Sequence, residues 1–280
     1  MPKTMAQAIS KLTVSDHRRD SAGLTYVYPV LSRRAGGVSV GINLNPNNAC
    51  NWRCIYCQVP DLKRGPAPKI VVRELESELR GLLGEYRVAG TAIKDIALSG
   101  NGEPTSAREF EQVISQIAVV MRDFDLTGKI KLVLITNGSL IHRQAVQAGL
   151  RLMAQNGGEV WFKLDRATRE GISRVNDVNM SIEKVVSNLR LCSALCPTWL
   201  QTCMFAIDGS APDAGERRAY LDLLRRFVPE GISLGGVLLY GIARASQQPE
   251  AERLSLVSLK WLRELGREIE VIGLRVKLTP

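Results

Sequence analysis

Short apolar runs rich in β-branched residues alternate with longer amphipathic runs along most of the chain. The short runs are typical of buried strands, and they predict strands at 38–44, 93–98, 130–136, 159–164, 199–207 and 232–240. The longer runs repeat apolar residues at the helical period, and they predict helices at 71–86, 107–122, 140–155, 182–195, 212–227 and 253–266. A last apolar run predicts a final strand at 270–278.

Alternation of strands and helices with short connections is typical of right-handed βαβ units and a parallel sheet. Six such units in about 240 residues favour an α/β fold, a partial (β/α) barrel of about six parallel strands. An open doubly wound sheet is the alternative. Because no linker or change in composition divides the chain, we expect one barrel domain at 26–280, preceded by a basic N-terminal arm at 1–25.

Composition excludes several classes of protein. The chain has 280 residues, of which 45% are apolar and 23% charged, so it does not resemble a disordered chain. No apolar stretch approaches the ~20 residues that a membrane-spanning helix needs. The N-terminus lacks the pattern of a secretory signal, and Ser32-Arg33-Arg34 lies too deep for a twin-arginine export signal. We therefore expect a cytoplasmic protein with no membrane partner.

The positive charge is unevenly distributed. The net charge is +9, and residues 1–38 hold six basic against two acidic residues, which gives +4 for that segment. A basic arm of this kind is typical of proteins that bind nucleic acid or another polyanion. It is equally typical of a solvated terminus, and the sequence leaves both interpretations open.

Three of the six cysteines, Cys50, Cys54 and Cys57, form a C-x3-C-x2-C pattern directly after the first predicted strand. Thiolates at this spacing suit an iron–sulfur cluster or zinc. A structural zinc site requires a fourth ligand, but the chain has only His17 and His142 as histidines, and neither is near. Three thiolates around a four-iron cubane leave one iron open for a cosubstrate, which favours a catalytic [4Fe–4S] cluster.

The motif, including Tyr56 before the third cysteine, resembles the cluster loop of the radical S-adenosylmethionine (SAM) superfamily. Further motifs match in the expected order. Residues 99–105 (Ser-Gly-Asn-Gly-Glu-Pro-Thr) are similar to the Gly-Gly-Glu-Pro loop of that superfamily, with Asn101 in place of its first Gly. Thr-Asn-Gly at 136–138 and Lys-Leu-Asp at 163–165 close the next two predicted strands, where many relatives carry Thr-Asn-Gly and Ser-Leu-Asp.

The flanking segments narrow the resemblance. Residues 29–34 (Pro-Val-Leu-Ser-Arg-Arg) and 41–46 (Gly-Ile-Asn-Leu-Asn-Pro) are similar to the iron–sulfur oxidoreductases grouped with wyosine-type tRNA synthetases. The resemblance covers about residues 26–245. It implies that an external donor supplies one electron to the cluster. The reduced cluster would then cleave SAM to methionine and a 5′-deoxyadenosyl radical. That radical would take a hydrogen atom from an unidentified substrate, for which a tRNA nucleoside is one candidate.

The resemblance also assigns roles to the motif residues. Cys50, Cys54 and Cys57 would hold the cluster. The cofactor-binding candidates for SAM are Tyr56, Gly100, Gly102, Glu103, Thr136 and Lys163. Tyr56 would lie against the adenine or simply pack beside the cluster. The backbone at Gly100 and Gly102 would hold the methionine amino group, which Glu103 would support unless it only fixes the turn. Thr136 would contact the carboxylate or ribose, unless it only ends a strand. Lys163 would bind the carboxylate, pair with an acidic neighbour such as Asp165, or form a Schiff base with the substrate.

Other residues and functions stay open at this level. Cys192, Cys196 and Cys203 are expected to be buried core residues, with an auxiliary cluster as the alternative. Arg33, Arg34 and Arg244 are candidates for recognising a phosphate or carboxylate, or for structural ion pairs. An activase that makes a glycyl radical on a partner protein is an alternative enzyme. A non-catalytic metal-binding interaction protein is the alternative of a different class.

Overall fold

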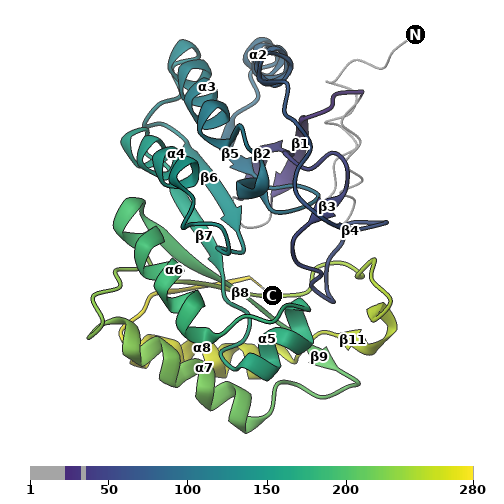
Figure 1. Cartoon of the computed structure of the whole chain (residues 1–280), viewed down its shortest axis with the longest axis vertical. Coiled ribbons are helices and arrows are strands. Elements are labelled where there is room, and N and C mark those ends of the chain that lie inside the picture. The colour runs from purple at the N-terminus through teal and green to yellow at the C-terminus, as the bar shows by residue number, and fades with distance from the viewer. Residues whose placement is uncertain (1–22, 33–35, 280) are drawn as a thin grey trace.

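The computed structural model describes residues 23–32 and 36–279. Its centre is an eight-stranded sheet in the order β1-β2-β5-β6-β7-β8-β10-β12 (Figure 1). The strands of this sheet are β1 (Val27–Ser32), β2 (Gly37–Ile42), β5 (Ile93–Leu98), β6 (Lys131–Thr136), β7 (Glu159–Lys163), β8 (Thr198–Met204), β10 (Val237–Gly241) and β12 (Val276–Thr279). Only β1 pairs antiparallel, with β2, and every other pair is parallel. The sheet curls into a half-barrel, which confirms the predicted α/β partial (β/α) barrel.

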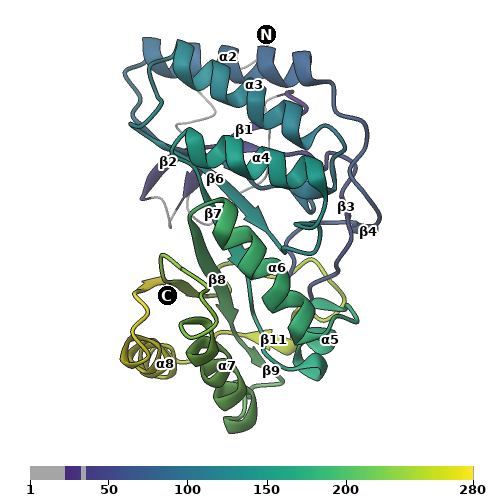
Figure 2. The ribbon, with the colours of Figure 1, turned by 60° about the vertical axis from the view of Figure 1, so that its left-hand side comes forward.

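Helices connect successive parallel strands and cover one face of the sheet (Figure 2). These helices are α2 (Val72–Val88), α3 (Phe110–Asp123), α4 (Gln144–Gln155), α6 (Ile182–Leu195), α7 (Ala214–Phe227) and α8 (Leu259–Val271). The largest hydrophobic core lies between them and the outer face of the sheet, with Ile96, Leu134 and Phe162 among its members. The outer face therefore supplies stability, because it buries most of the apolar surface.

The inner face of the sheet is lined differently. Because side chains alternate along a strand, the residues between the core positions point the other way. A separate small cluster there contains Ala97, Val133, Trp161, Trp199 and Leu238. At the carboxyl ends of the strands, a third cluster joins the inner face to the cysteine loop through Ile55, Val175, Cys203 and Phe205. Functional loops of parallel barrels gather at this end.

Several predicted boundaries were wrong. Helix α8 continues to Val271, so the final strand predicted from 270 begins only at Val276. The last helix begins at Leu259 instead of 253, because Ser258 is its N-cap and accepts a hydrogen bond from the Trp261 N–H. The residues before it form the short strand β11 (Leu254–Ser255), which pairs with β9 (Ala206–Ile207). The strand predicted from 232 begins only at Val237, because Gly236 has a φ of 141° and ends a turn.

Several short elements were not predicted. Strand β1 lies in a segment that we assigned to no element. Helix α5 (Arg169–Asn176) is only eight residues long, and Thr168 caps its N-terminus by accepting from the Gly171 N–H. A short 3-10 turn (Pro104–Ser106), a second at Ala251–Arg253 and the pair β3 (Ala49–Cys50) and β4 (Lys63–Arg64) complete the structure. The missed elements matter because α5 and β3 both support the cysteine loop.

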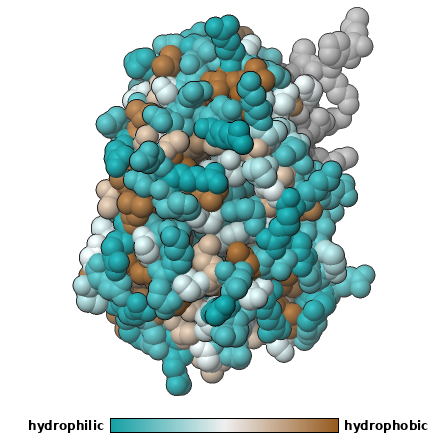
Figure 3. All heavy atoms as spheres, viewed as in Figure 1, coloured by the Kyte–Doolittle hydropathy of each residue, from teal (hydrophilic) through white to brown (hydrophobic). Residues whose placement is uncertain are grey.

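Most of the predicted basic arm, together with His17, Arg33 and Arg34, lies outside the described residues. The division into arm and barrel therefore stays a prediction. The described large apolar residues that are exposed are dispersed over several elements, namely Val71, Val88, Val228, Leu256, Leu259 and Val271. The face seen in Figure 3 is accordingly mainly hydrophilic with scattered hydrophobic residues. Among the described helices, none combines the length and apolar character needed to cross a membrane.

Candidate functional site

The three cysteines of the motif lie on one loop at the carboxyl end of β2. Cys50 ends the short strand β3, and the Cys57 N–H donates to the Cys54 carbonyl at 2.9 Å, which closes a tight turn. All three thiols are free and half-buried. Burial raises the pKa of Cys50 and of Cys54 to about 12, so as bare thiols both are protonated at neutral pH. A bound metal would reverse this, because a coordinating thiol loses its proton.

Two of the sulfur atoms already receive hydrogen bonds from amide donors. The Trp52 N–H donates to Cys50 Sγ at 3.5 Å, and Asn176 Nδ2 donates to Cys54 Sγ at 3.2 Å. N–H donors aimed at sulfur suit thiolates and are among the features that tune iron–sulfur clusters. Within residues 23–32 and 36–279, no three Cys, His, Asp or Glu side chains converge on one metal ion. A four-iron cubane does not need three ligands on one ion, since each of the three thiolates would bind a different iron and the fourth iron would stay open. The residues present therefore fit a four-iron cluster.

Backbone hydrogen bonds fix the loop against two distant segments. On one side, the Arg53 and Ile55 N–H groups donate to the carbonyls of Asn176 and Val175 at the end of α5, at 3.3 and 2.9 Å. On the other side lies segment 246–250, which sequence reasoning missed. Its Ser246 hydroxyl donates to the Ile55 carbonyl at 2.7 Å. These contacts pre-organise the loop, and no motif in the sequence indicated them.

A cluster of ion pairs ties the same segments together. Both terminal nitrogens of Arg53 donate to the carboxylate of Glu250, at 2.8 and 2.9 Å, and its Nε donates to Asp177 at 2.8 Å. Arg64 also pairs with Asp177, at 2.9 Å. Hydrogen bonds from Arg53 lower the pKa of both carboxyl groups. Arg53 lies between the first two cysteines, so this pairing holds the motif itself.

The 99–105 loop packs directly on the start of the cysteine loop. A Cβ at Gly100 would collide with the side chain of Asn43, and one at Gly102 would collide with the Ala49 carbonyl. The glycines are therefore required for close contact within the protein. Asn101, which departs from the family pattern, donates through Nδ2 to Asn48 Oδ1 at 2.6 Å. The substitution thus adds a hydrogen bond between the two loops.

Glu103 is buried at the centre of a hydrogen-bond network. Its Oε1 accepts from Thr105 Oγ1 and Thr136 Oγ1, both at 2.6 Å, and its Oε2 accepts from the Asn137 N–H at 2.7 Å. Burial raises the pKa of Glu103, while these hydrogen bonds oppose the rise. Asn137 Nδ2 in turn donates to Asn51 Oδ1 at 2.9 Å. The network joins the predicted Glu103 and Thr136 to the cysteine loop.

Tyr56 and Lys163 meet on the inner side of the loop. The Lys163 ammonium lies 4.9 Å from the centre of the Tyr56 ring, and that ring packs on Phe205 with centroids 5.3 Å apart. The Tyr56 hydroxyl donates to Asp165 Oδ2. Burial lowers the pKa of Lys163, but the charges of Asp165 and of the neighbouring Tyr240, Cys54 and Cys203 together outweigh burial and raise that pKa. Lys163 is therefore a fixed positive charge beside the cysteines.

Two buried oxygens beside the cysteine loop have no hydrogen-bond partner among the described residues. They are Asn45 Oδ1 and Asn101 Oδ1. Asn45 is fully buried and uses its Nδ2 to hold the Ala49 carbonyl at 2.9 Å. Unpaired buried acceptors are costly, so a ligand group that donates hydrogen bonds would stabilise this part of the site.

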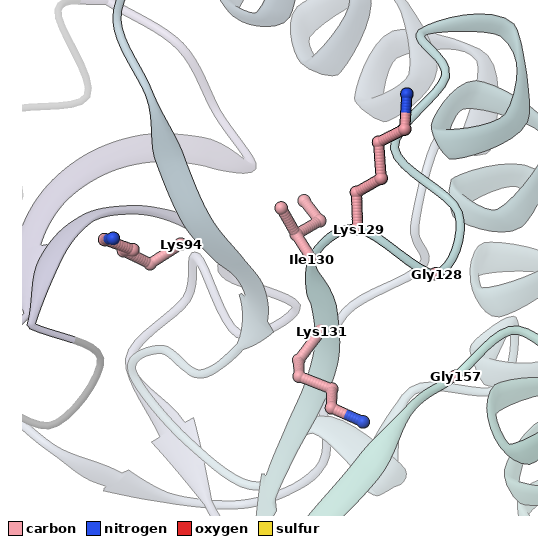
Figure 4. Close-up of a pocket in the computed structure, with 6 residues that line it drawn as sticks. All are labelled: Lys94, Gly128, Lys129, Ile130, Lys131 and Gly157. Carbon is pink, nitrogen blue, oxygen red and sulfur yellow. The ribbon is translucent and has the colours of Figure 1, made fainter.

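The other candidates lie elsewhere. Cys192 and Cys196 are buried under the opposite end of the sheet, and Cys203 is buried on its inner face, which agrees with the expected core role. Arg244 donates to Gln58 Oε1 at 3.1 Å, next to Cys57. A recess of about 140 Å³ lies at the opposite end of the sheet, between Lys94, Lys129 and Lys131 (Figure 4). The three lysines point away from one another there, and Lys129 pairs with Asp125.

Comparison with known proteins gives consistent results. Residues 44–210 match the family described as the Radical SAM superfamily. A UPF0026 protein of Helicobacter pylori strain J99 is 25% identical over 211 residues, which is 75% of this chain and 65% of that protein. The GTP 3′,8-cyclase of Aeromonas hydrophila is 32% identical over 108 residues, 37% of this chain and 28% of that enzyme. This chain thus spans less than two thirds of the length of either relative.

A solved structure shares the fold. The crystal structure of Streptococcus suis SuiB bound to S-adenosylmethionine superposes with a TM-score of 0.59 at 12% identity, over 86% of this chain and 50% of SuiB. The family match covers more than half of the chain, including the cysteine loop and the 99–105 loop. The chain belongs to the radical SAM superfamily, whose members hold a [4Fe–4S] cluster and bind SAM.

Proposed function

We propose that this chain is a radical SAM enzyme whose cluster is held by Cys50, Cys54 and Cys57. The observation that carries the proposal is the cysteine loop itself, with three half-buried thiols on a clamped turn and amide donors aimed at two of the sulfurs. When bound, such a cluster supplies the electron that cleaves SAM to methionine and a 5′-deoxyadenosyl radical. The substrate would lie on the inner face of the half-barrel and give up a hydrogen atom to that radical.

The chain would position SAM through hydrogen-bond acceptors for its ammonium group and a positive charge for its carboxylate. The unpaired oxygens of Asn45 and Asn101 suit the ammonium of its methionine moiety. The carboxylate of Glu103 already accepts hydrogen bonds from Thr105, Thr136 and Asn137, so its part is to hold its loop, with Gly100 and Gly102, against the 136–138 segment. Lys163 supplies the positive charge that favours the carboxylate. Tyr56 and Thr136 close the site on either side, and the packed loops exclude water.

For the substrate, we propose a nucleoside-containing molecule, with tRNA the first to test. The net charge of +9 favours a polyanion. The flanks of the motif resemble those of wyosine-type tRNA synthetases, and one relative is named for cyclising GTP. A tRNA substrate differs from the activase alternative in a measurable way, since an activase acts on a protein.

Anaerobic reconstitution tests the enzymatic proposal. We expect about four iron and four sulfide per chain, and formation of 5′-deoxyadenosine when SAM and a reductant are added. Cys54→Ala, assayed in parallel, should lose both the cluster and the product. Zinc in place of iron, or a full cluster that does not cleave SAM, would contradict the proposal and favour a non-catalytic metal-binding protein.

An electrophoretic shift with bulk tRNA at two salt concentrations tests the substrate class. Phosphate contacts release counterions, so we expect binding at low salt that weakens steeply as salt increases. Absence of binding even at low salt would exclude tRNA. The activase alternative would then be examined by looking for a glycyl radical on proteins of the same cell, with electron paramagnetic resonance as the readout.

A further inference from the structure

Gln201 is the most unusual polar residue of the inner face. It lies in the middle of β8 with 1% of its surface exposed, and neither its Nε2 nor its Oε1 has a hydrogen-bond partner in the described part of the chain. An unpaired buried amide costs stability at both of its ends. Natural proteins keep such a group mainly where function needs it. The unpaired Nε2 and Oε1 would be satisfied by a ligand that accepts one hydrogen bond and donates another.

The neighbours of Gln201 define what kind of ligand this is. On the adjacent strands, Lys163 and Leu238 are its register partners. Neighbouring strands lie about 4.8 Å apart, so the Lys163 side chain emerges beside the amide on the same face. Two residues nearer the amino ends of the same strands, and therefore on the same face, Trp161 and Trp199 are register partners of each other. The amide thus lies between a cation and a pair of indoles.

The depth of Gln201 separates it from the SAM site. Phe205, which packs on Tyr56 beside the cysteines, lies four residues further along the same chain segment. At about 3.3 Å per residue, Gln201 is roughly 13 Å deeper along the inner face. Lys163 begins at the depth of Gln201, but its ammonium extends to 4.9 Å from the centre of the Tyr56 ring, so the groups proposed to hold SAM still meet at the loop end, above Gln201. A substrate that faces the loops would lie below that end, beside Gln201.

We infer that Gln201 recognises an oxo-substituted nucleobase of the substrate, through a ring carbonyl and the adjacent ring N–H. The carboxamide is complementary to that edge, because its NH2 donates to the carbonyl while its oxygen accepts from the N–H. The Lys163 ammonium favours a carbonyl oxygen at this edge over an amino group. An ammonium and an amino group are both hydrogen-bond donors, so neither could accept from the other. The indoles of Trp161 and Trp199 give a flat apolar wall that suits a planar ring. The inference rests on the proposed function and narrows its substrate to guanine-type or uracil-type bases.

Calorimetric titration of the reconstituted full-length chain, saturated with SAM, tests this assignment with GMP, UMP and AMP as probes. Guanine and uracil present the carbonyl and N–H edge, whereas adenine presents an amino donor in place of the carbonyl. We expect GMP or UMP to bind about tenfold more tightly than AMP. Gln201→Met keeps the volume but removes both hydrogen-bonding ends, so it should abolish that preference. Equal binding of all three nucleotides, or no binding of any at millimolar concentration, would overturn the inference.

Thermal unfolding supplies a second readout that does not depend on activity. If Gln201 is kept for a ligand, Gln201→Met removes an unpaired buried amide and should raise the melting temperature by about 2 °C. Gln248→Met is the matched control, because Gln248 is also buried but donates to the Val59 carbonyl at 3.0 Å. That variant should melt lower than the parent. A lower melting temperature for Gln201→Met would show a structural role and refute the inference.

The same variant separates this inference from the proposed function. A parent chain that cleaves SAM but shows no base preference would refute the inference alone. A parent chain that binds no cluster would refute the proposed function, whatever the nucleotides do. If Gln201→Met weakened SAM as strongly as GMP, the amide would serve the adenine of SAM, and the assignment to the substrate would be wrong.

Discussion

The chain contains two groups of three cysteines that differ in almost everything except number. Cys50, Cys54 and Cys57 lie half-buried on a loop at the carboxyl end of the sheet. Cys192, Cys196 and Cys203 are buried in the packing of α6 and β8. Protonation does not separate the groups, because burial raises the pKa of Cys50, Cys54 and all three buried thiols to about 12. A high pKa in the bare chain is thus no sign of an inert thiol.

The kind of hydrogen-bond partner does separate them. In the loop, amide N–H groups donate to the sulfurs of Cys50 and Cys54, and the Cys50 thiol also donates to Asn51 Oδ1 at 3.9 Å. In the core, the Cys196 thiol donates to the Gly158 carbonyl at 3.7 Å, and Cys192 shares a contact of 3.6 Å with the Thr198 hydroxyl. Donors around sulfur stabilise a thiolate, whereas acceptors favour the thiol. Amide donors at sulfur therefore occur in the loop, whereas the buried sulfurs of Cys192 and Cys196 contact a hydroxyl and a carbonyl group.

The sharpest way to break this comparison is to remove one thiol from each group. Cys50→Ala should prevent stable cluster assembly and lower SAM cleavage by at least ~100-fold, because a thiolate ligand of the cluster is lost. Cys196→Ala should retain the iron content of the parent and lose only about 1 kcal/mol of stability, since it removes one buried sulfur atom. Iron analysis and the visible absorption of the cluster measure the difference. Loss of iron in Cys196→Ala would show that the buried group binds metal too.

Glu103→Gln extends the comparison from thiols to a buried carboxyl group. An amide placed there would turn an NH2 group toward the Asn137 N–H, so one hydrogen bond is replaced by a conflict between two donors. We expect SAM to bind about tenfold more weakly while the cluster is retained, as measured by equilibrium dialysis. Glu159→Gln is a control at the opposite end of the sheet, because Glu159 lies at the start of β7 and accepts from Trp161 Nε1 at 2.8 Å. Equal loss of SAM binding in both variants would contradict a local role for Glu103.

Most of the fold followed from hydrophobic periodicity, since the outer face of the sheet and the inner faces of the helices carry long, regular patterns. The elements that were missed are short. Strand β1 is antiparallel and lies outside the βαβ alternation, and α5 is too short to show a helical period. The late start of α8 had a signal in Ser258, whose N-cap role only became evident from its bond to Trp261.

The site shows the same limit. The motif residues could be found because their spacing reflects chemistry, but the residues that hold them are dispersed in sequence. Asn176 contacts Cys54 across 122 positions, and Glu250 contacts Arg53 across 197. Neither belongs to a local pattern, so only the folded chain reveals them. The roles of Tyr56, Gly100, Gly102, Thr136 and Lys163 toward SAM stay predictions.

Asn176→Leu tests whether the hydrogen bonds to sulfur distinguish the two cysteine groups. It removes the donor to Cys54 Sγ, so the reduced cluster is less stabilised and its reduction potential should fall, by on the order of tens of millivolts. A redox titration followed by electron paramagnetic resonance measures this shift. Thr198→Val removes the corresponding contact at Cys192 and should leave the potential unchanged. A shift in both variants, or in neither, would contradict the distinction.

The smallest expected effect concerns the ion pairs that clamp the cysteine loop, which the buried cysteines lack. Arg53 lowers the pKa of Asp177 and Glu250 below their ordinary values of 3.8 and 4.5. A carboxyl group with a lowered folded-state pKa contributes stability above its unfolded pKa, and this contribution disappears as pH falls through the folded value. Arg53→Met should therefore destabilise the metal-free chain at pH 7, by at most ~1 kcal/mol because the pairs are partly exposed.

The pH dependence makes this small effect specific. The difference in unfolding free energy between parent and Arg53→Met should shrink as pH is lowered from about 5 to below 3, because protonated carboxyl groups no longer pair. Arg80→Met provides the control, since Arg80 pairs with Glu76 and Asp123 on helices far from the motif. Only Arg53→Met should release iron to a chelator faster than the parent. Equal rates of iron release would mean that the ion pairs stabilise the fold without holding the cluster loop, and backbone contacts with α5 and Ser246 would then account for its order.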